Sequence, residues 1–89
     1  KSQNLVKKGR NYLYKEFGKM GLEYLESAAN FVLFKSPIGA TPLFKELLKE
    51  GVIVRAMDEY ELPDWARVTV GLDAENKIFI EKLKKVLGK

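Results

Sequence analysis

The stretch Trp65-Ala66-Arg67-Val68-Thr69-Val70-Gly71 contains an arginine inside an otherwise apolar segment. Alternation along an extended strand puts Val68 and Val70 on one face, and Arg67 and Thr69 on the other. The sequence therefore predicts a strand over residues 65–70 with one apolar face and one face that carries a guanidinium group. Burying an always-charged group costs several kcal/mol unless an anion meets it. Arg67 is therefore a candidate for binding a carboxylate or a phosphate, and a merely solvated charge is the alternative.

Apolar residues recur at three-, four- and seven-residue intervals in three segments, which indicates three amphipathic helices. The first is expected over residues 2–20, ended by Gly18 and Gly21. The second is expected to begin at Thr41-Pro42, where the threonine would cap the helix, and to close at Gly51. The third is expected to begin near Leu72-Asp73, and its inward-facing residues would be Ile78, Phe79, Leu83, Val86 and Leu87.

Short apolar segments between these helices predict strands over residues 22–27, 31–34 and 52–55, in addition to 65–70. Strand, helix and strand joined by short connections indicate a crossover unit, so 31–34 and 52–55 are expected to be parallel neighbours. The expected fold class is an α/β (α+β) small domain. A three- to four-stranded sheet would be covered by about three helices, and residues 1–89 would form a single domain.

The composition excludes several kinds of chemistry. The chain has no cysteine and no histidine, so it has neither a thiolate nucleophile nor the commonest metal ligand and general base. No apolar run approaches the ~20 residues that cross a bilayer, so we expect no membrane contact and a cytoplasmic protein. The net charge of +4 is spread over the polar faces of the helices, which favours solvated faces over nucleic-acid binding.

Arg55 lies at the end of the strand that precedes Arg67, with one loop between them. If the two strands are close in the sheet, both guanidinium groups can face one cleft and bind a ligand that has an anionic group at each end. A salt bridge from Arg55 to Asp58, Glu59 or Glu61 is the alternative. The acidic residues of this loop indicate a solvated segment and no metal site.

Three segments carry a resemblance to a known family: Asn30–Lys35, Gly51–Arg55, and Leu62–Gly71 with Glu75-Asn76 following. In order and spacing they resemble the C-terminal small domain of histidinol-phosphate aminotransferase, over essentially all 89 residues. The chain is thus similar to the pyridoxal-phosphate aminotransferases of fold type I. It departs from the usual pattern of the family at three positions. Many members have glycine in place of Glu61, a larger aliphatic residue in place of Ala66, and a capping threonine in place of Leu72.

The resemblance implies roles for the two arginines. Arg67 would bind the α-carboxylate of the substrate, and Arg55 would lie near its phosphate-bearing end, whereas Asn30 would be structural. The cofactor, pyridoxal phosphate, would be bound by a large domain that this chain lacks, so the chain has no catalytic or cofactor-binding residue and alone would be inactive. The partners implied are small molecules, namely an amino acid or amino alcohol phosphate with 2-oxoglutarate or glutamate. The full-length enzyme of histidine biosynthesis would be a homodimer.

Two other functions remain open at this point. The same arginine pair could serve a related enzyme, such as a phosphothreonine decarboxylase or an aromatic aminotransferase. Alternatively, the chain could be a stand-alone basic α/β module that binds an anionic ligand or RNA, although basic and aromatic residues do not cluster together in the sequence as such a surface requires.

Overall fold

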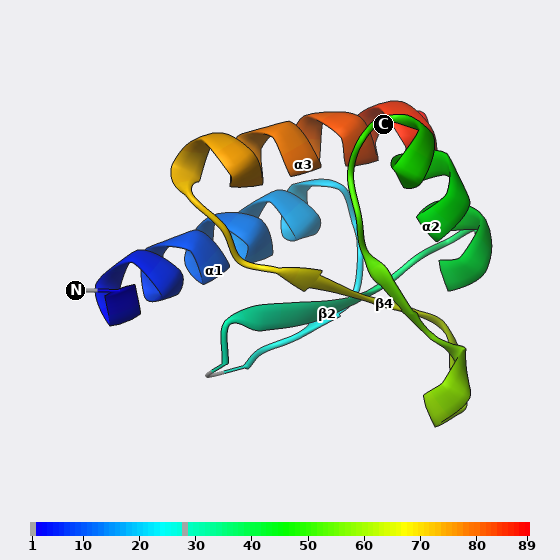
Figure 1. The fold of residues 1–89 in the computed structure, drawn as a ribbon, viewed down its shortest axis with the longest axis horizontal. Coiled ribbons are helices and arrows are strands. Elements are labelled where there is room, and N and C mark those ends of the chain that lie inside the picture. The colour runs from blue at the N-terminus through cyan, green and yellow to red at the C-terminus, as the bar shows by residue number, and fades with distance from the viewer. Residues whose placement is uncertain (1, 28) are drawn as a thin grey trace.

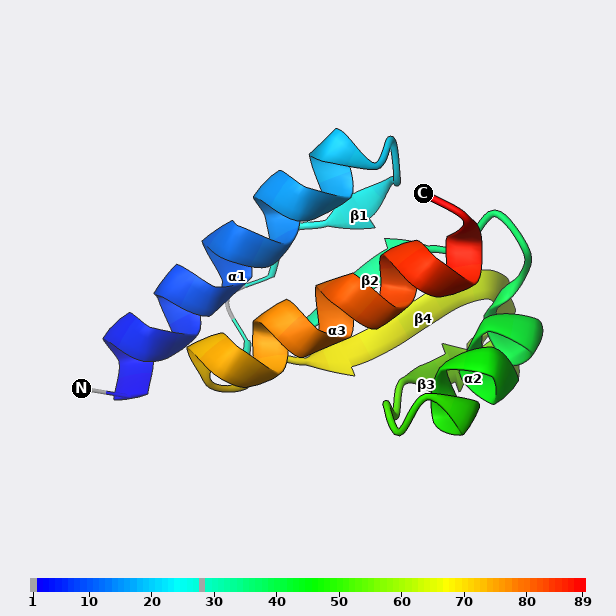
Figure 2. The ribbon, with the colours of Figure 1, turned by 90° about the horizontal axis from the view of Figure 1, so that it is seen from above.

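Three helices cover one face of a four-stranded sheet in the computed structural model, which describes residues 2–27 and 29–89 (Figures 1 and 2). The helices are α1 (Ser2–Lys19), α2 (Ala40–Lys49) and α3 (Asp73–Leu87). The strands are β1 (Tyr24–Leu25), β2 (Phe31–Lys35), β3 (Arg55–Met57) and β4 (Leu62–Thr69), with a short 3-10 turn, η1 (Asp58–Tyr60), between β3 and β4. This confirms the expected fold class.

The strand order is β1-β2-β4-β3, and every pair of neighbours is antiparallel. The prediction that the second and third strands are parallel neighbours is therefore wrong. They run in the same direction, but β4 lies between them and pairs with both. The physical reason is that β4 folds back on β3 across a short turn. With eight residues it is also long enough to offer its other edge to β2.

The third strand also begins later than expected. Residues 52–54 lie outside the ladder, and only 55–57 pair with β4. Within that irregular segment Val54 is buried, whereas Ile53 is 74% exposed. An apolar run at the edge of a sheet can bury its side chains under a neighbouring helix without backbone pairing, and this is why the hydrophobic pattern overestimated the strand.

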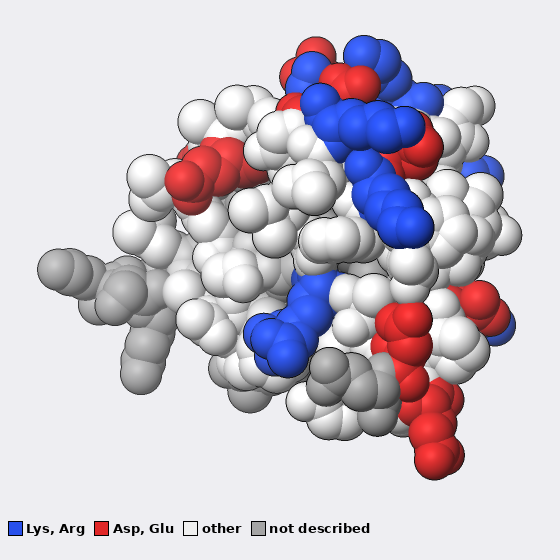
Figure 3. Space-filling model, turned by 45° about the vertical axis from the view of Figure 1, so that its right-hand side comes forward, with Lys and Arg blue, Asp and Glu red and all other residues white. Residues whose placement is uncertain are grey.

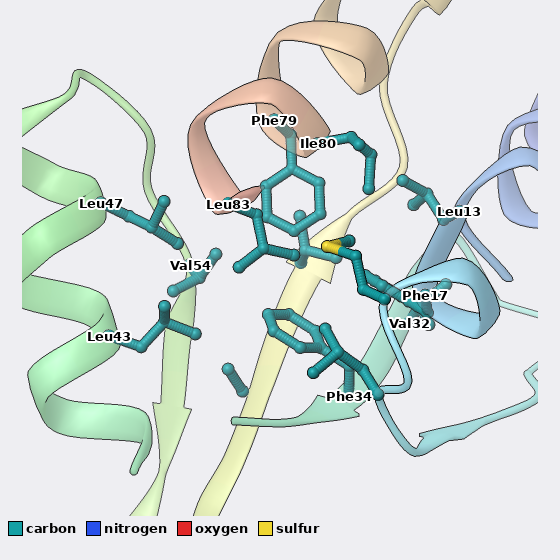
Figure 4. Packing of buried hydrophobic residues seen from close by; sticks show 14 of the residues in the cluster. Leu13, Phe17, Val32, Phe34, Leu43, Leu47, Val54, Phe79, Ile80 and Leu83 are labelled. Carbon is teal, nitrogen blue, oxygen red and sulfur yellow. The ribbon is translucent and has the colours of Figure 1, made fainter. Parts of the chain in front are cut away.

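The core lies between the sheet and the helices (Figure 4). Val32 and Phe34 of β2 and the small Ala66 of β4 form its floor, and the rings of Phe17 and Phe34 stack with centroids 4.9 Å apart. On α3 the buried stripe consists of Phe79, Ile80 and Leu83, with Asn76 one turn earlier. Ile78 was expected inside but is 49% exposed, because it lies about 160° around the helix from the buried Ile80.

Two predicted helix ends differ from the observed ones. Helix α1 continues through Gly18 to Lys19, and only Gly21, with φ of 73°, has the left-handed backbone typical of a helix end. Gly39 occupies the N-cap of α2, and the predicted cap Thr41 lies inside the first turn. Its hydroxyl Oγ1 donates instead to Oδ2 of Asp58, at 2.7 Å.

None of the helices in the described ranges combines the length and the apolar character that a membrane span requires.

Candidate functional site

Arg55 and Arg67 are direct partners in the β3–β4 ladder, and the next pair along is Ala56 with Ala66. Residues directly opposite in an antiparallel pair project from the same face, with Cβ atoms roughly 4.5–5.5 Å apart. Since Ala66 is fully buried under the helices, the two arginines project from the opposite face of the sheet. The structure thus brings together the two residues that the sequence singled out.

Both arginines line a pocket of about 620 Å³ at the β3 edge of the sheet. This volume is within the range of small-molecule sites, roughly 300–1,000 Å³. The other lining residues come from α2, from β3 and the segment before it, and from β4: Thr41, Phe44, Lys45, Ile53, Val54, Ala56 and Thr69. Three of the lining residues are basic and none is acidic, so the pocket has the charge to attract an anion.

Arg67 is the more firmly positioned of the two. It lies in the central strand, where it is paired with Leu33 on one side and with Arg55 on the other. Its side chain is half-buried, and its guanidinium carbon Cζ lies 5.0 Å from the centroid of the Phe31 ring. A cation over an aromatic face gains about 0.5–1 kcal/mol at such a site. Arg55, on the edge strand, is exposed.

Two acidic residues of the β3–β4 turn, Asp58 and Glu61, were expected as possible partners of Arg55. Among the described side chains, no carboxylate forms an ion pair with either arginine of the pocket, and this includes Asp58 and Glu61. Asp58 accepts the hydrogen bond from Thr41 instead. The predicted alternative of a salt bridge from Arg55 to Glu59 concerns a side chain outside the described part of the structure.

Basic and acidic atoms intermingle over the top of the molecule in Figure 3, where α3 and the end of α2 lie, and acidic atoms gather at the lower right, near the β3–β4 turn. Glu50, at the C-cap of α2, lies between Lys82 and Lys85 of α3, with Nζ–Oε1 distances of 3.5 and 3.1 Å. These lysines are therefore partly neutralised, as expected of solvated helix faces.

Other residues named from the sequence have structural roles or open surroundings. Asn30 accepts a hydrogen bond through its backbone oxygen from the amide of Val70, at 2.8 Å, which agrees with a structural role. Lys35 is exposed at the end of β2, with its Nζ 3.6 Å from a carboxylate oxygen of Glu23. Within the described residues, no group of three or more acidic, cysteine or histidine side chains is arranged to hold a metal ion.

The sequence reasoning assigned no role to Asn76, although the structure gives it one. Its buried side chain forms two hydrogen bonds with the backbone of Gly71: Oδ1 accepts from the amide at 2.9 Å, and Nδ2 donates to the carbonyl at 3.1 Å. This clamp fixes the turn from β4 into α3. An asparagine one turn into a predicted helix and five positions after a glycine is the sequence signal that could have revealed it.

Comparison with known proteins agrees with this architecture. The sequence model of the family "Aminotransferase class I and II" matches residues 1–83. Among curated relatives, histidinol-phosphate aminotransferase 2 of Carboxydothermus hydrogenoformans is 49% identical over 79 residues, which is 89% of this chain and 22% of that protein. Histidinol-phosphate aminotransferase of Symbiobacterium thermophilum is 44% identical over 88 residues, which is 99% of this chain and 24% of that protein.

Solved structures show the same fold. The histidinol-phosphate aminotransferase from Clostridium acetobutylicum superposes with a TM-score of 0.85 and 29% identity, covering 94% of this chain and 27% of that one. An aspartate aminotransferase from Thermotoga maritima has the same TM-score at 18% identity, over 97% of this chain and 24% of the other. The chain spans roughly a quarter of the length of the curated relatives it matches. It belongs to the class I and II aminotransferase family.

Proposed function

We propose that this chain is the small, substrate-binding domain of a pyridoxal-phosphate-dependent aminotransferase that acts on histidinol phosphate in histidine biosynthesis. Relatives named histidinol-phosphate aminotransferase are 42–49% identical to most of the chain, which supports histidinol phosphate as the substrate. The single observation that carries the proposal is the pair of guanidinium groups, Arg55 and Arg67, side by side in a pocket without an acidic lining residue.

In this proposal each arginine binds one of the anionic groups of the two substrates. Arg67 binds the α-carboxylate of glutamate or 2-oxoglutarate through a bidentate pair, and its half-buried position strengthens that bond. Arg55 binds the phosphate of histidinol phosphate. Because the two side chains project from the same face, a doubly charged phosphate can also contact both. Held in this way, the substrate presents its amino-bearing carbon in one orientation, which is the main contribution of a positioning residue.

The residues described here do not fit pyridoxal phosphate itself. When bound, this cofactor supplies the electron sink for transamination. A lysine that holds it must be shielded from water and set among partners for the phosphate, whereas Lys45, the lysine of the pocket, is exposed, and Lys35 is exposed beside Glu23. We therefore propose that the cofactor is held by a part of the protein outside this chain, that the full-length protein is a homodimer, and that the 89 residues alone do not transaminate.

The test is kinetic and uses the full-length protein that contains this domain. Arg67→Ala should lower kcat/KM for glutamate by about two orders of magnitude, because truncating one partner of a desolvated charge pair costs about 2–5 kcal/mol. Arg67→Lys keeps the charge but loses the bidentate guanidinium group, so its kcat/KM should lie between those of the wild type and Arg67→Ala. Lys77→Ala, at an exposed position of α3, is the control. Near-normal kcat/KM in Arg67→Ala would refute the assigned role.

The choice of substrate needs a separate measurement. Turnover of histidinol phosphate should exceed turnover of aromatic amino acids and of phosphothreonine, and the reverse order would move the protein to another enzyme of the same family. An open reading frame that encodes little more than these residues would instead favour a stand-alone anion-binding module.

A further inference from the structure

Asp58 is the described carboxylate nearest to Arg55 in sequence, and the hydrogen bond that it accepts from Thr41 decides where it points. Only two residues separate Arg55 from Asp58 in the sequence, and a salt bridge between them was one of the expected outcomes. The structure shows none. Instead, the side chain of Asp58 lies against the first turn of α2, where Oδ2 is 2.7 Å from the hydroxyl of Thr41.

Two features of α2 make its first turn a favourable place for this carboxylate. The N-cap residue is Gly39, so no side chain caps the helix, and the first turn contains no acidic residue. The unpaired amides and the positive end of the helix dipole therefore lack a negative partner from α2 itself, and a carboxylate placed there is stabilised. The Thr41 hydroxyl adds a hydrogen bond to a charged acceptor, which fixes the direction of the side chain.

The position of Thr41 connects this bond to the site. Thr41 and Arg55 both line the pocket, whereas Asp58, which accepts the hydrogen bond from the Thr41 hydroxyl, is not one of its lining residues. We propose that Thr41 is a positioning residue: its hydroxyl holds Asp58 on α2 and thereby leaves Arg55 free to bind the phosphate of the substrate. This inference rests on the proposed function, since it assigns a ligand to Arg55.

Releasing Asp58 should weaken phosphate binding without disturbing the chemistry. Thr41→Val keeps the shape of the side chain and removes the donor. A freed carboxylate that pairs with an exposed arginine gains up to about 1 kcal/mol, which corresponds to a loss of affinity for a competing anion of up to about fivefold. In the full-length enzyme we expect KM for histidinol phosphate to rise about two- to fivefold, kcat to stay within about twofold, and KM for histidinol, which lacks the phosphate, to stay unchanged.

Two further variants separate this effect from a general disturbance of the fold. Thr41→Ser restores the hydroxyl and should restore KM. Asp58→Asn in the Thr41→Val background removes the competing charge, so the double variant should regain the preference for histidinol phosphate over histidinol even though the hydrogen bond is still missing. Unchanged KM in Thr41→Val, or failure of Asp58→Asn to rescue it, would overturn the role of Thr41.

Arg55→Ala separates the role of Thr41 from the role of Arg55. If this variant loses the preference for the phosphorylated substrate while Thr41→Val keeps it, only the inference about Thr41 fails. If Arg55→Ala keeps the preference, the proposed role of Arg55 fails, and the inference about Thr41 fails with it.

Discussion

Arg55 and Arg67 face each other directly across the β3–β4 ladder, so two like charges are cross-strand neighbours. Like charges in this position destabilise a sheet by a few tenths to about 1 kcal/mol. The isolated domain therefore keeps an unfavourable pair that an anionic ligand can relieve.

Replacing Arg55 should stabilise the free domain. Arg55→Thr should raise the free energy of unfolding of the 89-residue chain by about 0.2–1 kcal/mol in low salt, measured by urea denaturation. Arg55→Lys keeps the charge and should gain little. The gain should shrink as salt screens the repulsion. A gain that is equally large at high salt would mean that strand propensity, and not charge, is responsible.

Two glycines of α1 should respond to alanine in opposite ways. A Cβ on Gly9 would lie 2.5 Å from Cγ1 of Val70 and 2.8 Å from Nδ2 of Asn76, so Gly9→Ala should destabilise the domain by about 1–3 kcal/mol. A Cβ on Gly18 meets nothing within 4 Å, so Gly18→Ala should stabilise it by about 0.5–1 kcal/mol through helix propensity. Thermal unfolding of the two variants checks both signs, and equal effects would contradict the packing described.

Glu61 is the non-glycine residue with positive φ in the described part of the chain, at 62°. The left-handed conformation costs about 1–2 kcal/mol for a residue with a Cβ. Glycine avoids this cost, but it loses more conformational entropy on folding, which offsets part of the gain. Glu61→Gly should therefore stabilise the domain by about 0.5–1 kcal/mol. Glu61→Ala retains the strain and should show no such gain in the same denaturation experiment.

Leu72 precedes α3 at the N-cap position, where it forms no side-chain cap. Half of a capping box is already present, since Oε1 of Glu75 accepts a hydrogen bond from the amide of Leu72 at 2.8 Å. Leu72→Thr supplies the missing hydroxyl and should add about 0.5–1.5 kcal/mol of stability, because the exposed leucine contributes little packing. Leu72→Val, of similar shape without the hydroxyl, should not reproduce the gain in melting temperature.

Glu50 should make the stability of the domain depend on acid. A hydrogen bond from Lys85, with the nearby charges of Lys85 and Lys82, holds the pKa of the Glu50 carboxyl below its ordinary value of 4.5. A carboxyl whose pKa is lowered by folding stabilises the folded state above the unfolded pKa, and this contribution disappears as the pH falls through the folded pKa. The melting temperature of wild type should therefore drop more than that of Glu50→Gln below about pH 4.5. Parallel curves for the two proteins would contradict this.

Local patterns in the sequence were sufficient for the helices and for the face of β4 that carries Arg67. Periodicity identified α1 and the beginning of α3, and alternation placed Arg67 and Val68 on opposite faces of the strand. These two patterns were sufficient because each depends only on neighbours along the chain. The direct pairing of Arg55 with Arg67 is a matter of register. Only the general requirement that the two strands be close was inferred from the sequence.

Features that depend on distant partners could not be obtained in this way. The central place of β4 is decided by pairing with β2, about 30 or more positions earlier, and no local pattern encodes it. The role of Thr41 likewise depends on a distant partner, because its hydroxyl donates to Asp58 and does not cap the helix backbone. The choice of Ile80 over Ile78 depends on a rotation of α3 that packing against α1 and the sheet determines.

The placement of β4 has a consequence for synthesis. The middle of the sheet is the last strand to be made, so β2 and β3 emerge from the ribosome with open edges and nothing to join them. Until residues 62–69 have left the exit tunnel, β1 can pair only with β2 and β3 has no partner strand. The apolar side chains of the helices then lack the sheet surface on which they pack. Folding of this unit during translation must therefore wait for nearly its whole length, and unpaired edges in that interval are the points at which a helper protein would be needed.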